Sequence, residues 1–370
     1  MMTRIFTAVA LVFLVALPRV ASAQSVAWTI GDKAITHASS GLSAQRKIGP
    51  FGYKGVTTFS KPQEGLDTAA QWETADGKSA ITLYAYLPTL GDEGLAFIAT
   101  DRVIRSRFGT ATKLANDMLV SVGGVPAGAR VVDYDGAVGT GGFSGPLWTA
   151  FSVLRAGDWL IKIRVSGPVA QKSVLKSALT QLLGALKFSP ANLPQTIHKI
   201  TVSPCTTEGQ FPAAKRVTLS PEEIVKDVQL ISGLDFGATD KAGKRAYIKR
   251  MPDAFCYDES ATPPGQSYAV LYPLKGRVRG TITETAMIII FGDSGTLLEV
   301  SQTDRSQPRY VMILHSVGEA NFMSYVDGPL NSAQIAAIVS GKDDGMAKFI
   351  AGYDVKANGE VAGYVIGLKK

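Results

Sequence analysis

Hydrophobic and polar residues alternate in several stretches of the first half of the chain, which is the pattern of half-buried β-strands. Residues 159–165 are the clearest case, because Trp159, Ile161 and Ile163 fall on one face and Lys162 and Arg164 on the other. Similar stretches predict strands at 81–86, 118–122, 130–134 and 147–154.

Two stretches have the spacing of amphipathic helices instead. The first helix is expected to begin at Gly91 and Asp92 and to end at Gly109. Its apolar stripe includes Phe97 and Ile104. The second covers about 169–186 and is striped by leucines. Meandering strands with one early and one late helix predict an antiparallel α+β domain over residues 24–190.

The order of these elements resembles a known family. A helix follows a tyrosine-rich strand, and the domain closes with the strand "WLIKIRVSGP" and the helix "LKSALTQLLGALKF". Residues 25–190 thereby resemble the Mog1/PsbP-like α/β/α sandwich family. The resemblance implies a binding or assembly role, and it carries no catalytic residue over to this chain.

Prolines in the polar stretch 188–194 predict a linker, placed at 191–196, before a second domain at 197–370. Ser220 and Pro221 begin a helix there, and Asn331 caps another. Further strands are expected at 267–274, 277–291, 296–302, 309–316 and 361–368. The predicted fold class is therefore α+β, with two domains that are each a mainly antiparallel β-sheet packed by helices.

The N-terminus has the pattern of a secretory signal peptide over residues 1–23. Arg4 precedes an apolar run at 5–17, Pro18 ends that run, and Ala21 and Ala23 suit a cleavage site. We expect cleavage between Ala23 and Gln24, a periplasmic or secreted location, and no transmembrane segment in the mature chain.

Composition excludes several classes of protein. The chain has 370 residues, 46% of them hydrophobic and 19% charged, which is too apolar for a disordered protein. Its net charge is +7, and residues 24–190 carry +5 while 191–370 are neutral. Because the basic residues are scattered, no nucleic-acid partner is expected. Weak contact with an anionic envelope surface stays open.

Cys205 and Cys256 are the only cysteines. An even pair in an exported protein predicts one structural disulfide. Two free or intermolecular thiols are the alternative. The three histidines, His37, His198 and His315, are too isolated in sequence for a zinc site, so neither a metal nor a cofactor is expected.

The string Gly-Asp-Ser-Gly at 292–295 resembles the nucleophile block of serine hydrolases. Ser294 would need a histidine base, and His315 lacks the Asp-x-x-His spacing of SGNH-type enzymes. We therefore favour a hairpin turn at this string. Four aromatic residues, Tyr84, Tyr86, Trp148 and Trp159, are expected to pack in the core or against neighbouring strands, with a ligand groove as the alternative.

Three functions remain from the sequence. The leading one is a non-enzymatic exported protein of two domains that binds a protein partner or assists envelope assembly, with no catalytic residues assigned. The alternatives are an esterase-like serine hydrolase that uses Ser294, with His315 as its base, and a carrier of a small ligand.

Overall fold

A computed structural model divides the chain into two compact units, one ending at His198 and the other beginning at Lys199. The predicted signal peptide at 1–23 lies outside the described residues. The structure describes residues 27–59, 65–109, 111–139, 144–206, 211–232, 251–259, 261, 268–274, 284–292, 295–304, 308–342, 346–357 and 361–365.

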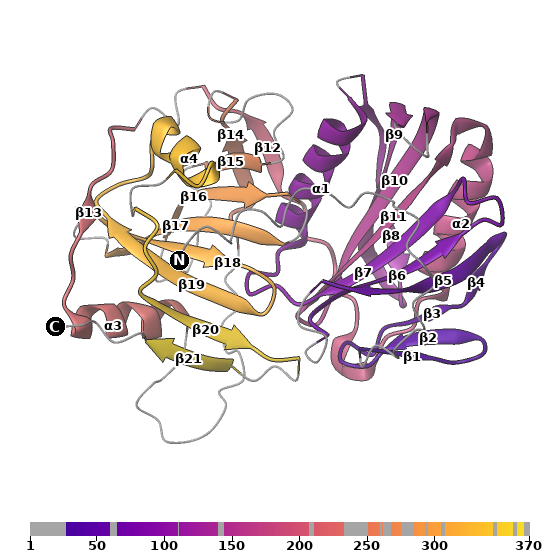
Figure 1. Cartoon of the computed structure of the whole chain (residues 1–370), viewed down its shortest axis with the longest axis horizontal. Coiled ribbons are helices and arrows are strands. Elements are labelled where there is room, and N and C mark those ends of the chain that lie inside the picture. Colours follow the sequence, from indigo (N-terminus) through magenta and orange to yellow (C-terminus); the bar gives the residue numbers. More distant parts are fainter. Residues whose placement is uncertain are drawn as a thin grey trace. The chain divides into compact units, whose positions relative to one another are not determined.

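The first unit is built on an eight-stranded antiparallel sheet (Figure 1). Its strands, in spatial order, are β4 (Lys47–Ile48), β5 (Phe51–Thr58), β6 (Asp67–Glu73), β7 (Ala80–Tyr86), β11 (Trp159–Pro168), β10 (Gly145–Ala156), β9 (Val125–Gly139) and β8 (Lys113–Val122). A separate three-stranded sheet contains β1 (Trp28–Ile30), β2 (Ala34–His37) and β3 (Ser43–Gln45).

Two helices lie against opposite faces of the larger sheet. Helix α1 (Glu93–Phe108) packs Phe97 and Ile104 on Phe151 and Val153 of β10. Helix α2 (Lys172–Ala185) brings Leu175 against Gly167 of β11. Val153 is paired with Lys162 of β11, so these two side chains lie on the same face of the sheet. Lys162 and Gly167 are five residues apart and therefore lie on opposite faces, so the two helices contact different faces.

The caps of α1 confirm the helix predicted from the sequence. The carboxylate of Asp92 accepts a hydrogen bond of 2.9 Å from the backbone N–H of Leu95, as an N-cap does. Gly109 ends the helix with a φ of 93°, a conformation that favours glycine.

The second unit is built on a ten-stranded mixed sheet. Its main path is β12 (Thr201–Pro204), β14 (Ala254–Tyr257), β15 (Tyr268–Pro273), β16 (Glu284–Phe291), β17 (Thr296–Asp304), β18 (Arg309–His315), β19 (Glu319–Val326), β20 (Ala351–Val355) and β21 (Val361–Val365), with β13 (Arg216–Val217) beside β19. Only the pair β12–β14 is parallel among these described strands.

Each face of this sheet also has one helix. Helix α3 (Pro221–Ser232) packs its Ile224 and Val228 with Val311 and Ile313 of β18. Helix α4 (Ser332–Val339) belongs to a second cluster that includes Met312. Because Met312 lies between Val311 and Ile313 along β18, the two helices cover opposite faces.

The predicted fold class is wrong. The structure is mostly β, with three sheets and four α-helices in the described residues, and is not a helix-packed α+β sandwich. The structure contains more strand than the sequence predicted. β9 and β10 are 15 and 12 residues long, and six described strands, β1–β6, precede β7. One of that set, β5, has the sequence FGYKGVTT, in which glycines interrupt the alternation that would have predicted it.

The segment predicted as a linker, 191–196, is hydrogen-bonded to the first unit. The backbone N–H of Gln195 donates to the carbonyl of Arg155 at 2.9 Å. The N–H of Ile197, just beyond the segment, donates to the carbonyl of Ala127 at the same distance. These contacts explain why the first unit continues to His198.

Candidate functional site

The outer strand of the first sheet, β8, combines an open edge with exposed apolar side chains. Among the described residues it pairs only with β9. Met118 and Leu119 are 45% and 46% exposed, although both sit inside a regular strand. They point to opposite faces of the sheet, because successive residues alternate.

Two neighbouring polar residues of the same strand, Asn116 and Asp117, form hydrogen bonds with β9. Asp117 receives two hydrogen bonds from the guanidinium of Arg130 on β9, of 2.8 and 2.9 Å. Arg130 is buried, and its Cζ lies 3.3 Å from the centre of the Phe97 ring. Asn116 donates to the buried carboxylate of Asp133 at 2.7 Å. In residues 116–119 the two polar side chains are hydrogen-bonded to β9 while Met118 and Leu119 are exposed, which is the reverse of the usual arrangement.

Further charged contacts hold β9, and through it β8, in place. Lys176 of α2 lies 3.4 Å from the second oxygen of Asp133, and Lys172 lies 3.1 Å from Asp135. On the other face, the hydroxyl of Tyr134 donates to Asp101 of α1 at 2.6 Å. Burial, reinforced by the nearby Asp101 carboxylate, raises the pKa of Tyr134 far above its usual range. The stretch Asp133-Tyr134-Asp135 thus serves as a scaffold for the edge.

Irregularities bound the usable part of the edge. The register between β8 and β9 shifts between Leu114 and Asn116 and again between Val120 and Val122. Ala127, in the second irregularity, has a φ of 52°, which is uncommon for a residue with a side chain. Residues 116–120 form the longest stretch of β8 in regular register with β9, and this five-residue stretch has the sequence Asn-Asp-Met-Leu-Val.

Sequence reasoning predicted a half-buried strand at 118–122 and therefore did not identify its apolar residues as an exposed site. A signal was present in the order of the residues. In 116–120 the polar residues come first and the apolar residues follow, so the stretch lacks the period-two alternation of a strand with one buried face.

Of the two residues in the serine-hydrolase hypothesis, the structure describes only His315. Ser294 lies outside the described residues. His315 is 5% exposed, and its Nε2 lies 3.1 Å from Oε2 of Glu299. The other oxygen of Glu299 accepts hydrogen bonds from Thr285 and Ser301, at 2.7 and 2.5 Å. This cluster is a buried polar network inside the second unit.

The other two histidines also have local partners in the first unit. His37 is buried, with its ring centre 5.0 Å from Trp28 and 4.8 Å from Trp159. The backbone N–H of His198 donates to Glu93 at 2.7 Å, and its Nδ1 lies 3.8 Å from Asp92. Burial, together with the neighbouring Asp92, raises the pKa of Glu93.

The four aromatic residues that were weighed as a groove do not form one. Tyr84 and Tyr86 lie on the same face as Lys162, whose Nζ is 4.8 and 5.8 Å from their rings. Trp159 has the opposite parity to Lys162 along β11 and contacts His37 instead. Trp148 is 1% exposed. Three of the four are buried in the core, and the half-buried Tyr84 packs against its cross-strand partner Lys162, so the prediction of core or cross-strand packing is confirmed.

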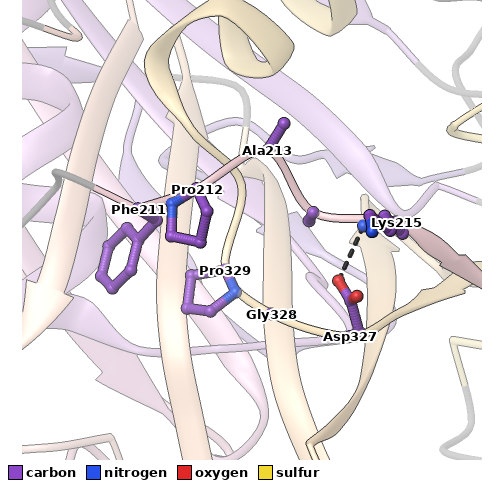
Figure 2. Close-up of a pocket in the computed structure, with 8 residues that line it drawn as sticks. Phe211, Pro212, Ala213, Lys215, Asp327, Gly328 and Pro329 are labelled. Carbon is purple, nitrogen blue, oxygen red and sulfur yellow. Dashed lines mark hydrogen bonds between the residues drawn. The ribbon is translucent and has the colours of Figure 1, made fainter.

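A small pocket lies on the second unit, with a volume of about 260 Å³. Figure 2 shows Phe211 and Pro212 on one side, Pro329 facing them, and Asp327 near Lys215. The Asp327 carboxylate accepts a hydrogen bond of 2.7 Å from the backbone N–H of Lys215 and is thus already engaged. Pockets that enclose small ligands usually measure roughly 300–1,000 Å³, so this one gives little support to a carrier.

The predicted disulfide is confirmed. Cys205 and Cys256 are bonded, 51 residues apart in sequence. The bond fastens the end of β12, whose four residues are all exposed, to the buried strand β14.

Neither a metal cluster nor a membrane helix is found within the described ranges. There, no group of three or more His, Cys, Asp or Glu side chains could hold a metal ion. In the same part of the chain, no helix has the length and apolarity needed to cross a bilayer.

Comparison with known proteins assigns no family. No family model matches the chain, and no curated protein matches it. The resemblance of residues 25–190 to the Mog1/PsbP-like family therefore stays a prediction from element order.

Proposed function

We propose that this chain is an exported protein that binds a protein partner through the exposed apolar edge at β8. The observation that carries the proposal is the reversed pattern of residues 116–119. Asn116 and Asp117 are held by β9, while Met118 and Leu119 are left in water. Covering exposed apolar side chains with a partner removes apolar surface from water, and this makes binding more favourable.

Three further features agree with this proposal. The chain starts with the pattern of a signal peptide, so the partner would be met in the periplasm or outside the cell. Ion pairs that each include one buried partner hold the edge, and a surface ordered before binding loses little entropy when a partner binds. Met118 and Leu119 lie on opposite faces beside the open edge, so a strand that pairs with β8 could contact an apolar side chain on each face.

The proposal assigns no catalytic residue. His315 is buried and paired with Glu299, but Ser294 lies outside the described residues, so no observed contact supports the alternative of a serine hydrolase. Assistance in envelope assembly is one form that partner binding would take.

Photo-crosslinking in the exporting cells tests this function. Benzoylphenylalanine replaces Leu119 in one variant and Val138 in another, because Val138 is an equally exposed apolar residue of the same sheet. We expect a crosslinked adduct of defined size from position 119 that is absent or much weaker from position 138. Equal adducts from both positions, or none from either, would overturn the proposal.

A further inference from the structure

The open edge of β8 offers backbone hydrogen bonds as well as apolar side chains. In an antiparallel sheet, the N–H and C=O groups of alternate residues in an edge strand point away from the neighbouring strand. Within the described residues, no other strand pairs with that side of β8. An extended chain laid along 116–120 would extend the sheet by one strand.

The occupant is constrained by the order of residues in this stretch. In an antiparallel pair of two copies of β8, a two-fold axis sets the first half of the stretch against the second half. Centred on Met118, this places Asp117 opposite Leu119 and Asn116 opposite Val120. A carboxylate already bound to Arg130 would then face an apolar side chain. In this register, pairing between two copies is disfavoured and a different chain is favoured.

The positive charge of the first unit favours an acidic partner segment. Residues 24–190 carry a net charge of +5, so the first unit attracts acidic chains. Lys113, at the start of β8, is exposed, and no described carboxylate forms an ion pair with it. An acidic residue at one end of the bound segment would lie near this ammonium group.

We infer that β8 accepts, by strand addition, an extended segment of another protein that is apolar in its centre and acidic at one end. This inference rests on the proposed function and specifies how the same edge binds. Peptides that bind to sheet edges take affinity from main-chain hydrogen bonds and selectivity from alternate side chains. Met118 and Leu119 would supply the contacts on the two faces.

Labelled peptides test the inference by fluorescence anisotropy with the mature protein. The probe is a capped peptide of alternating valine and threonine that ends in two glutamates. One comparison peptide ends in two lysines, and another has proline at its centre, which removes a backbone donor. We expect the glutamate peptide to bind most tightly and the proline peptide to lose about tenfold or more in affinity.

Protein variants complete the test. Met118→Thr with Leu119→Thr keeps a strand-forming residue at both positions and should weaken binding of the glutamate peptide about tenfold. The matched control Val138→Thr should leave it unchanged. Lys113→Gln should weaken the glutamate peptide about threefold and leave the lysine peptide unaffected.

Several results would overturn strand addition while leaving partner binding intact. If the proline peptide binds as tightly as the parent, or if no peptide binds while the Leu119 crosslink persists, the edge does not accept a strand. If the protein sediments as a dimer that the Met118/Leu119 double variant dissolves, the occupant is a second copy. If the lysine peptide binds equally well, the acidic requirement is wrong.

Discussion

The carboxylate of Glu299 and the imidazole of His315 form a buried pair in the second unit, with Oε2 and Nε2 3.1 Å apart. They lie on neighbouring strands of one sheet face, where Thr285 and Ser301 bind the other carboxylate oxygen. Removing one partner of a buried polar pair leaves the other without compensation.

Replacement of His315 tests the importance of this pair. We expect His315→Ala to lower the free energy of unfolding of the second unit by about 3 kcal/mol. His315→Gln should lose less, because its amide can still donate to Glu299. All four tryptophans belong to the first unit, so far-UV circular dichroism reports the change while tryptophan fluorescence serves as the control. Equal losses in the two variants would show that the hydrogen bond is unimportant.

His37 should make the first unit less stable in mild acid. The Gly65 carbonyl can only accept, so Nε2 carries the proton and Nδ1 accepts from Ser40. Burial lowers the pKa of His37 from 6.5 to about 4. Between these values the unfolded chain binds a proton that the folded protein does not, so the stability present above pH 6.5 is lost as pH falls.

The full loss attributable to His37 is about 3 kcal/mol near pH 4. Urea unfolding followed by tryptophan fluorescence measures it directly, because His37 contacts Trp28 and Trp159. His37→Gln, compared with the parent at pH 7 and pH 4, should lose correspondingly less stability on acidification. Parallel losses in the two proteins would contradict the prediction.

The disulfide should stabilise the second unit alone. Closing a loop over a separation of 51 residues contributes about 4 kcal/mol in the chain-entropy description. The double variant Cys205→Ala, Cys256→Ala should therefore unfold at lower denaturant, and the reduced parent should match it. An unchanged second-unit transition, or an equal shift of the tryptophan signal, would count against this assignment.

Two glycines with similar backbone angles should respond differently to alanine. Gly136 and Gly77 have φ values of 74° and 68°. A Cβ at Gly136 would lie 2.5 Å from the carbonyl oxygen of Ala111, whereas one at Gly77 meets nothing within 4 Å. Gly77→Ala should cost about 1 kcal/mol from its φ alone, and Gly136→Ala about 3 kcal/mol or more. Thermal unfolding of both variants measures the difference.

Local signals in the sequence predicted individual elements well. Asp92 and Gly109 bound α1 as expected, and the side chain of Asn331 caps α4. Such features depend on residues within one turn of each other, so the sequence contains the whole interaction. The pairing of Cys205 with Cys256 was predictable because no other cysteine exists.

The β-rich fold was harder to predict, because strand pairing depends on residues far apart in sequence. β5 carries two glycines, and β12 is exposed along its whole length, so neither shows a hydrophobic face. The edge at β8 was equally hidden. That Asp117 is held and Leu119 exposed follows from the position of Arg130 on β9 and of Phe97 on α1.

The two irregularities that flank residues 116–120 also limit how far this edge could pair with the edges of other molecules. A long, flat, apolar edge can recruit one molecule after another into a fibre. Here the register shifts on both sides of a five-residue stretch. An added strand could therefore form regular hydrogen bonds with only a short part of β8. The same two irregularities would limit the length of the partner segment that can pair with β8.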